Sequence, residues 1–217
     1  METPKDRHTT AIDMFDQRVD QYVDQFMEVD RYADTLEQLS KAVNQTDAKV
    51  LELACGPGNL TSFLHQHNPD WQITATDMSS NMLEYAGKRM PEVNFVPLDM
   101  RDLAKLGTTW DAIICGFGLP YPSPKEGEVL IQEASQCLRP GGVLYLSTME
   151  GTERDSGWKG SSSGMGPKIF IQYYEALFLE KIVQQNGFSI VSQARKEYEL
   201  PLGNPVTDLI LITSKNH

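Results

Sequence analysis

The sequence predicts a doubly wound α/β fold with a mainly parallel sheet. Short apolar stretches alternate along the chain with segments in which apolar residues recur every three or four positions. This is the pattern of strands followed by amphipathic helices. The stretch at residues 111–115 is apolar beyond its first residue, as expected for a strand that is buried on both faces. Such strands, separated by helices, indicate a parallel sheet that is covered on both sides.

Length and composition are those of one globular domain, and no linker divides residues 1–217. Apolar residues make up 40% of the chain, and 19 basic and 30 acidic side chains give a net charge of −11. This acidity disfavours nucleic acids and anionic membrane surfaces as partners. The three cysteines lack zinc-site spacing, and no apolar run is long enough for a signal peptide or a membrane span. We therefore expect a cytoplasmic protein without a metal site.

The N-terminal segment, residues 1–45, is predicted to form a helical cap. Apolar residues at helical spacing over residues 11–43 indicate amphipathic helix with one break near residues 28–30. Four aspartates recur along this stretch and are interpreted as a solvated helix face: Asp13, Asp16, Asp20 and Asp24. His8 precedes the helix and is expected in the terminal tail.

Residues 46–148 are predicted to form the core of the sheet. Five strands are expected, at residues 50–53, 71–77, 93–98, 111–115 and 143–148. Helices should connect them, and the helix before the fifth strand should end at Pro140. Pro97 should lie near the end of its strand or on an edge strand, because proline has no N–H to donate.

The C-terminal part begins with an interruption of the alternation. Residues 149–173 include a Gly/Ser-rich stretch, interpreted as a mobile loop on the acceptor side of the site. Residues 174–217 then return to regular structure, with a helix over about residues 173–186. Strands follow at residues 188–194 and 206–213. Their connection is too short for a crossover, so the two strands should pair antiparallel.

Glycine and acidic residues gather where the predicted strands end, which is where doubly wound sheets bind ligands. Gly56 and Gly58 follow the first strand, where glycines let backbone N–H groups approach a ligand. Asp77 ends the second strand and can accept hydrogen bonds from both hydroxyls of a ribose. Asp99 follows the third strand, where it could accept from an adenine amino group. Either acid could instead cap a helix, but the four residues together indicate an adenosine-bearing ligand.

Two further residues distinguish between adenosine-bearing ligands. Thr61 stands where a dinucleotide-binding loop has its third glycine. Glu52 lies within the first strand, and a buried carboxylate there needs a partner. A ligand ammonium, reached directly or through water, would provide one. The two residues favour an amino-acid-bearing nucleoside over a pyrophosphate-bearing dinucleotide.

The sequence resembles the class I S-adenosylmethionine-dependent methyltransferases, of the small-molecule kind that includes the ubiquinone-biosynthesis enzymes. The resemblance extends from about residue 15 to residue 213. It rests on five segments, at residues 50–60, 76–79, 98–100, 110–114 and 138–142. It implies a Rossmann-like, seven-stranded, mainly parallel sheet whose last strand is antiparallel, with S-adenosyl-L-methionine as the cofactor.

The resemblance also implies roles for individual residues. The methionine portion of the cofactor would be lined by Glu52, Ala54, Gly56, Gly58, Gly116 and Phe117. Asp77 would hold the ribose, and Met78 would pack on the adenine. Asp99 and Met100 would meet the adenine edge. Tyr22 matches a tyrosine that often closes over the cofactor, and a core-facing position is an equal alternative.

Methyl transfer from a sulfonium is an in-line displacement with an activated donor, so the resemblance implies catalysis mainly by proximity and alignment. No catalytic residue is assigned, because His65 and His67 are expected on the surface and the other histidines in the tails. Ala54 replaces a glycine that is usual in the family, and we expect a modest shift in loop packing there.

The expected acceptor is a small molecule, covered by the N-terminal helices, residues 118–124 and the segment up to residue 174. Its identity and the oligomeric state stay open. Two alternative functions also stay open: a non-catalytic S-adenosylmethionine-binding protein and, less favoured, an NAD(P)-dependent oxidoreductase.

Overall fold

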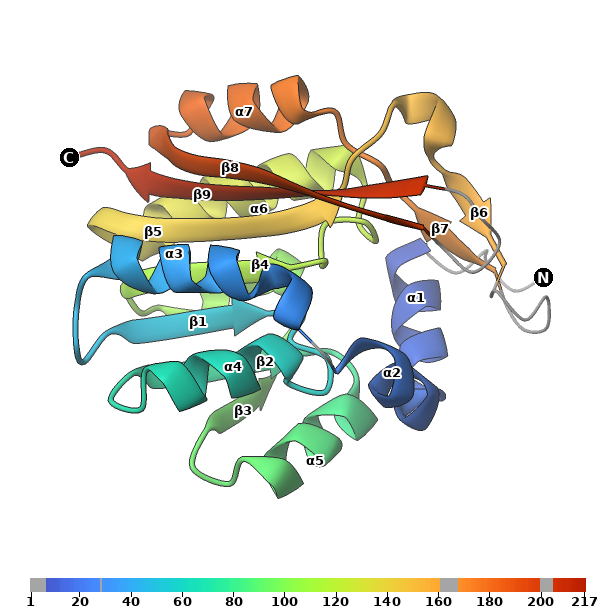
Figure 1. The fold of residues 1–217 in the computed structure, drawn as a ribbon, viewed down its shortest axis with the longest axis horizontal. Coiled ribbons are helices and arrows are strands. Elements are labelled where there is room, and N and C mark those ends of the chain that lie inside the picture. Colours follow the sequence, from blue (N-terminus) through green and yellow to red (C-terminus); the bar gives the residue numbers. More distant parts are fainter. Residues whose placement is uncertain (1–6, 28, 161–167, 200–204) are drawn as a thin grey trace.

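A seven-stranded sheet of order β3-β2-β1-β4-β5-β9-β8 forms the centre of the computed structural model (Figure 1). The structure describes residues 7–27, 29–160, 168–199 and 205–217. The sheet strands are β1 (Lys49–Leu53), β2 (Gln72–Asp77), β3 (Asn94–Pro97), β4 (Trp110–Gly116), β5 (Leu138–Met149), β8 (Phe188–Glu199) and β9 (Pro205–Lys215). β1 to β5 pair parallel, and β9 runs antiparallel to both β5 and β8. The predicted fold class is confirmed.

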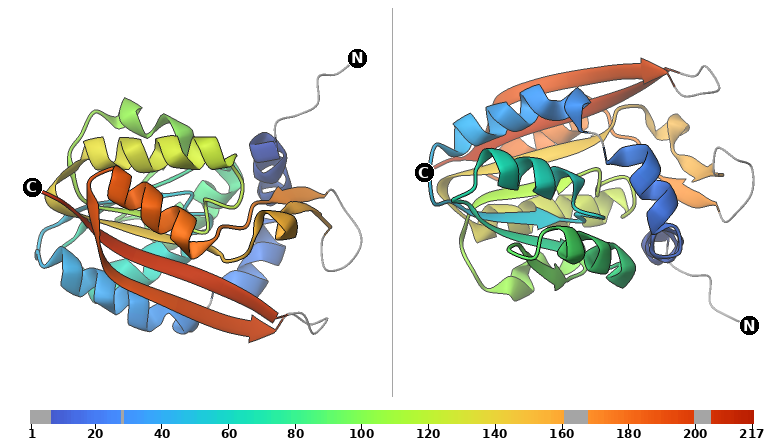
Figure 2. Two further views of the ribbon diagram at one scale, coloured as in Figure 1. Left: turned by 90° about the horizontal axis from the view of Figure 1, so that it is seen from above. Right: turned by 60° about the horizontal axis from the view of Figure 1, so that its bottom comes forward.

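Helices cover both faces of the sheet, as the apolar strands require (Figure 2). α3 (Ala33–Val43), α4 (Asn59–His67) and α5 (Ser80–Arg89) pack on one face. α6 (Pro124–Cys137), α7 (Ala176–Gln185) and the 3-10 segment η2 (Met100–Leu106) pack on the other. Each face has its own apolar core, and neighbouring residues of a central strand serve different cores: Ile113 joins the α6/α7 side and Ile114 the α3/α4 side.

The N-terminal cap contains one helix more than expected. α1 (Arg7–Asp16) is followed by α2 (Val19–Phe26), and a 3-10 turn, η1 (Asp30–Tyr32), leads into α3. The expected break near residues 28–30 is present, and a second one falls at Arg18, whose φ of −133° and ψ of 33° lie outside the helical region. α1 and α2 lie beyond the carboxyl end of β1 instead of on a face of the sheet (Figure 1).

The segment predicted to be a loop at residues 149–173 contains regular structure. It carries a 3-10 turn, η3 (Glu153–Asp155), and a two-stranded hairpin of β6 (Gly157–Lys159) and β7 (Ile169–Ile171). The edge-to-face contact of Trp158 with Phe170 joins the two strands, with ring centroids 5.8 Å apart. The part of the expected mobile loop at residues 161–167 lies outside the described residues.

Other element ends differ by a few residues from the predictions. β5 begins at Leu138, because that residue pairs with Trp110 before the register shifts, so the Pro-Gly-Gly turn is included in the strand. Pro97 ends β3, which is an edge strand of the sheet, and both alternatives for this proline are therefore realised.

Candidate functional site

A pocket lies at the carboxyl ends of the parallel strands, against helix α1. It is lined by residues of α1 (Arg7–Asp16) and α2 (Val19–Phe26) and by residues at the ends of β1 to β4. Eight of the eleven residues predicted to bind a cofactor line it: Tyr22, Ala54, Gly56, Asp77, Met78, Met100, Gly116 and Phe117. The other three, Glu52, Gly58 and Asp99, are not among its lining residues.

The loop after β1 forms one wall and is built from left-handed backbone. Ala54, Gly56 and Gly58 have φ values of 52°, 55° and 81°. A Cβ on Gly56 would lie 3.9 Å from the Tyr22 ring, an ordinary contact distance, so it is the positive φ that favours glycine here and not a lack of space. A Cβ on Gly58 would come within 2.6 Å of the Met90 side chain, so that glycine serves the packing of α5 instead of the pocket. Ala54 adopts the conformation that glycine favours, at a cost of about 1 kcal/mol or more.

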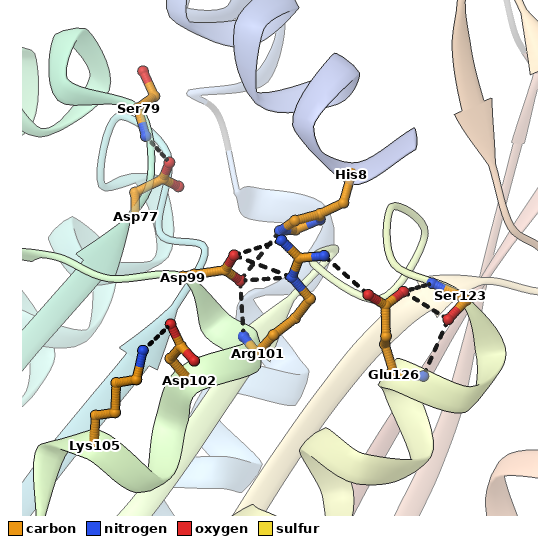
Figure 3. Close-up of polar contacts among 9 residues, drawn as sticks. All are labelled: His8, Asp77, Ser79, Asp99, Arg101, Asp102, Lys105, Ser123 and Glu126. Atoms are coloured by element: carbon orange, nitrogen blue, oxygen red, sulfur yellow. Dashed lines mark hydrogen bonds and ion pairs between the residues drawn. The ribbon is translucent and has the colours of Figure 1, made fainter. Parts of the chain in front are cut away.

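Asp77, the last residue of β2, is hydrogen-bonded to the loop after β1 and to its own following turn, and it lines the pocket. Its Oδ2 accepts a hydrogen bond of 2.8 Å from the Gly56 N–H. Its Oδ1 accepts one of 2.8 Å from the Ser79 N–H, which is drawn in Figure 3. Burial raises the pKa of this carboxyl, and the backbone N–H donors counteract that rise. A carboxylate offers roughly four lone-pair sites, so the two oxygens keep acceptor capacity toward the pocket. Next to it, Met78 is 44% exposed and gives the pocket an apolar wall.

Glu52 is buried behind the loop, and its partner is a residue of the protein. The Thr61 hydroxyl donates to Glu52 Oε2 at 2.5 Å. Burial raises the pKa of Glu52 to about 8, against the effect of this hydrogen bond. Thr61, which stands where a dinucleotide loop has its third glycine, thus provides the hydrogen-bond partner of Glu52. The sequence could not reveal that these two residues are in contact. Sequence reasoning treated these two residues as separate signals.

Asp99 lies in a cluster of charged side chains beside the adenine end expected for the pocket (Figure 3). Arg101 donates to both of its oxygens, with Nη2 2.7 Å from Oδ2, and His8 Nε2 lies 3.4 Å from Oδ1. Burial raises the pKa of Asp99, but the hydrogen bonds from Arg101 and the proximity of His8 outweigh it, so the pKa is lowered overall. Arg101 also binds Glu126, which caps α6 together with Ser123.

His8 is not a tail residue. It belongs to α1, is only 5% exposed and lines the pocket. The prediction failed because the helix was expected to begin near residue 11, whereas the structure begins it at Arg7. The position of His8 against Asp99 gives α1 a polar contact with the segment after β3.

Aromatic side chains enclose the other end of the pocket. Phe15 makes edge-to-face contacts with Tyr22 and Tyr121, at centroid distances of 5.6 and 5.2 Å. Tyr22 lines the pocket. Burial, together with the Asp77 and Glu52 carboxylates, raises the pKa of Tyr22 to about 12. Phe117 has a φ of 56°, and its N–H donates to the carbonyl oxygen of Ser147 at 3.0 Å.

Comparison with known proteins identifies the central segment. The family described as "Methyltransferase domain" matches residues 50–142. The resemblance found in the sequence is confirmed, and the match counts against a nicotinamide oxidoreductase.

Curated proteins to which this chain is similar have different substrates in their names. Trans-aconitate 2-methyltransferase of Acidovorax ebreus is 31% identical over 132 residues, which cover 61% of this chain and 50% of that protein. Demethylmenaquinone methyltransferase of Thermotoga maritima is 34% identical over 98 residues, which cover 45% of this chain and 42% of that protein. The chain spans about half the length of such relatives or less.

Among solved structures, the magnesium protoporphyrin IX methyltransferase of Synechocystis PCC 6803 with bound SAM has a TM-score of 0.72. Its sequence identity is 19%, and the match covers 100% of both chains. At this identity the likeness concerns the fold, and it extends beyond the methyltransferase domain to the N-terminal helices and the C-terminal strands.

The pocket has eight lining residues that were not among the predicted cofactor contacts: His8, Ala11, Ile12, Phe15, Met82, Leu98, Gly118 and Tyr121. The first four lie on one face of α1, at the i, i+3, i+4 and i+7 positions. This spacing was visible in the sequence, but an apolar helix face by itself does not reveal whether it covers a pocket or a sheet.

Among the described residues, no group of three or more His, Cys, Asp or Glu side chains could hold a metal ion. A search of the same residues finds no helix with the length and apolar character needed to cross a membrane.

Proposed function

We propose that the protein transfers the methyl group of S-adenosylmethionine to a small-molecule acceptor. The observation that carries the proposal is Asp77. A carboxylate at the exit of β2 faces a pocket and is held by the N–H of Gly56 at the exit of β1. Two hydroxyls of a ribose are suitable donors for its remaining acceptor sites. Gly56 and Met78 line the same pocket beside this carboxylate.

The cofactor contacts follow from the walls of the pocket. Asp77 would bind the ribose, Met78 and Met100 would hold the adenine, and Asp99 would act at the adenine edge beside its ion pair with Arg101. The methionine portion would lie along the loops after β1 and β4: Ala54, Gly56, Gly116 and Phe117. Tyr22 would close this end. Glu52 and Gly58 would act indirectly, by holding the loop and its packing on α5.

Catalysis would depend on alignment. The cofactor supplies an activated methyl group on a sulfonium, and the chain holds its two ends so that an acceptor approaches in line. With a pKa raised to about 12, Tyr22 keeps its proton at neutral pH and serves as a wall and hydrogen-bond donor instead of a base. The aromatic rings beside it exclude water from the transfer.

We further propose a cytoplasmic location and a single domain over residues 1–217. The three free cysteines support a reducing compartment. Residues 1–45 would close the site, residues 46–148 would bind the cofactor, residues 149–173 would face the acceptor, and residues 174–217 would complete the sheet. The net charge of −11 supports a small-molecule acceptor over a nucleic acid.

Calorimetric titration with S-adenosylhomocysteine tests the proposal. We expect the wild type to bind, and Asp77→Ala to weaken binding by about 100-fold, because charge-assisted hydrogen bonds to the ribose are lost. Asp77→Asn keeps the size of the side chain but has one acceptor oxygen, so it removes the charge and can keep only one of the two loop contacts.

The matched control is Asp70→Ala. Asp70 is exposed and lies just before β2, at the opposite end of that strand from the pocket. Its removal should leave the affinity unchanged. A folded wild-type protein that does not bind S-adenosylhomocysteine would exclude the proposed cofactor.

A further inference from the structure

His8 presents a polar side chain to the end of the pocket proposed for adenine. It lies in the first turn of α1, is 5% exposed and lines the pocket together with Ala11, Ile12 and Phe15 of the same helix. Among the described α1 residues that line the pocket, His8 alone has a polar side chain. A buried histidine on an otherwise apolar wall is suited to recognise a polar group of the ligand.

Asp99, the acid expected at the adenine edge, has its acceptor sites filled by Arg101. Its Oδ1 accepts hydrogen bonds from the backbone N–H and from Nε of Arg101, both at 3.0 Å. Its Oδ2 accepts from Nε at 3.0 Å and from Nη2 at 2.7 Å. A carboxylate has roughly four lone-pair sites, and Asp99 is not among the lining residues that the described part of the chain gives the pocket. Asp99 is therefore placed to act at the adenine edge through a neighbour.

That neighbour is His8, whose ring Asp99 orients. The Nε2 atom of His8 lies 3.4 Å from Asp99 Oδ1 (Figure 3). A neutral imidazole that turns one nitrogen toward a carboxylate keeps its proton on that nitrogen, so its other nitrogen is an acceptor. For His8, this assigns the proton to Nε2 and the acceptor role to Nδ1. The exocyclic amino group of adenine is a donor and matches such an acceptor.

The charged groups around His8 agree with a position beside the nucleoside. Burial acts to raise the pKa of both Asp77 and Asp99, and His8 counteracts this at both carboxyls, so it lies close to the two acids. The guanidinium of Arg7 lies over an aromatic ring of β7, 4.8 Å from its centroid, and that of Arg101 binds Asp99. Of these basic side chains, His8 is the one that lines the pocket.

We propose that His8 determines specificity for the nucleobase by accepting a hydrogen bond from the 6-amino group of the cofactor's adenine, and that Asp99 is a positioning residue that acts through His8. The inference rests on the proposed function and names the side chain that selects the base. A 6-oxo base such as hypoxanthine presents an acceptor in place of the amino group. Two acceptors would then face each other away from water, which lowers affinity.

Calorimetric titration with S-adenosylhomocysteine and S-inosylhomocysteine tests the proposal, because the two compounds differ at the 6-amino group. The wild type should bind the adenosine compound at least about 10-fold more tightly. His8→Leu should reduce this preference to less than about 3-fold. His8→Asn, which keeps an acceptor near the position of Nδ1, should retain most of it.

The matched control is His65→Leu. His65 lies on α4 and forms an exposed pair with Glu92, with Nε2 3.0 Å from Oε1. Its removal also takes away a histidine beside a carboxylate and should leave the preference unchanged. If His8→Leu does not fold, His8→Phe keeps an aromatic ring without the acceptor and should show the same loss of preference.

A double-mutant cycle distinguishes the roles of the two residues. Asp99→Asn should lower the preference in the wild type and have no further effect in His8→Leu, because Asp99 acts through His8. An effect of full size in the His8→Leu background would show that Asp99 contacts the base directly and would overturn the proposal.

A preference that survives His8→Leu would also overturn it. Displacement of α1 alone would weaken both compounds alike and leave their ratio unchanged, so the ratio distinguishes recognition of the base from packing. Equal, measurable binding of the two compounds to the wild type would contradict the role of His8 and leave the proposed cofactor standing. Binding of neither compound would exclude the cofactor itself, and with it the role of His8.

Discussion

The hydrogen-bonded pair Glu52 and Thr61 lies behind the pocket loop and makes the stability of the fold depend on pH. Glu52 lies in the central strand β1 among apolar residues, and its carboxyl is bonded to the Thr61 hydroxyl on α4. Its pKa is raised to about 8 from an ordinary value of 4.5, first of all by burial. At neutral pH the folded protein therefore keeps a proton there that the unfolded chain releases.

This difference makes stability depend on pH. The contribution of Glu52 is complete below pH 4.5 and declines as the pH rises through about 8. At about 1.4 kcal/mol for each pKa unit, it amounts to up to about 5 kcal/mol. Urea unfolding between pH 5 and 8.5 should show a steeper loss of stability in the wild type than in Glu52→Gln. Parallel curves for the two proteins would contradict the raised pKa.

Helix α1 covers the pocket, and Asp16 at its end fixes it to the start of α5. Its Oδ1 accepts hydrogen bonds from the Ser79 hydroxyl at 2.7 Å and from the Asn81 N–H at 3.1 Å. Ser79 also caps α5. The end of α1 is thereby joined to the start of α5, directly after Asp77 and Met78. Asp16 is not part of a solvated face, as its spacing with the other aspartates had suggested.

We expect Asp16→Ala to weaken binding of S-adenosylhomocysteine by about 10-fold, the equivalent of roughly one hydrogen bond to a charged group. The cause is the loss of the contact that holds α1 over the pocket. Asp20→Ala, in the exposed part of α2, is the comparison for the change in charge. Equal affinities of the two variants would show that this contact does not hold the pocket wall.

At the scale of the whole molecule, the sheet separates two apolar cores, and α7 belongs to one of them. Leu179 is 1% exposed in the core under α6 and α7, whereas Leu177 on the same helix is 75% exposed. The two positions offer the same chemical change in opposite surroundings.

Leu179→Ala should lower the free energy of unfolding by about 2–5 kcal/mol, since it removes apolar contacts and leaves a cavity. Leu177→Ala should change it by less than about 0.5 kcal/mol. Denaturant unfolding of both variants measures the difference. A similar effect at the two positions would contradict the packing of α7 on the sheet.

The sequence by itself determined the alternation of strands and helices, the parallel core and the residues at the strand exits. The reason is that these features are local: apolar periodicity reports burial of one face, and Gly56 or Asp77 follows its strand directly along the chain. In an α/β sheet of this order, the exits of β1 and β2 must lie side by side, so the pocket could be placed without coordinates.

Only the tertiary structure decided what covers that pocket and which polar groups meet. Asp16 and Ser79 are 63 residues apart in the sequence, and Tyr32 and Asp208 are 176 apart. The contact between His8 and Asp99 is also decided by long-range packing. All three contacts depend on how the N-terminal helices pack beyond the edge of the sheet. Helical spacing predicts that α1 has an apolar face, but the surface that this face covers is set by long-range packing, which no local pattern specifies.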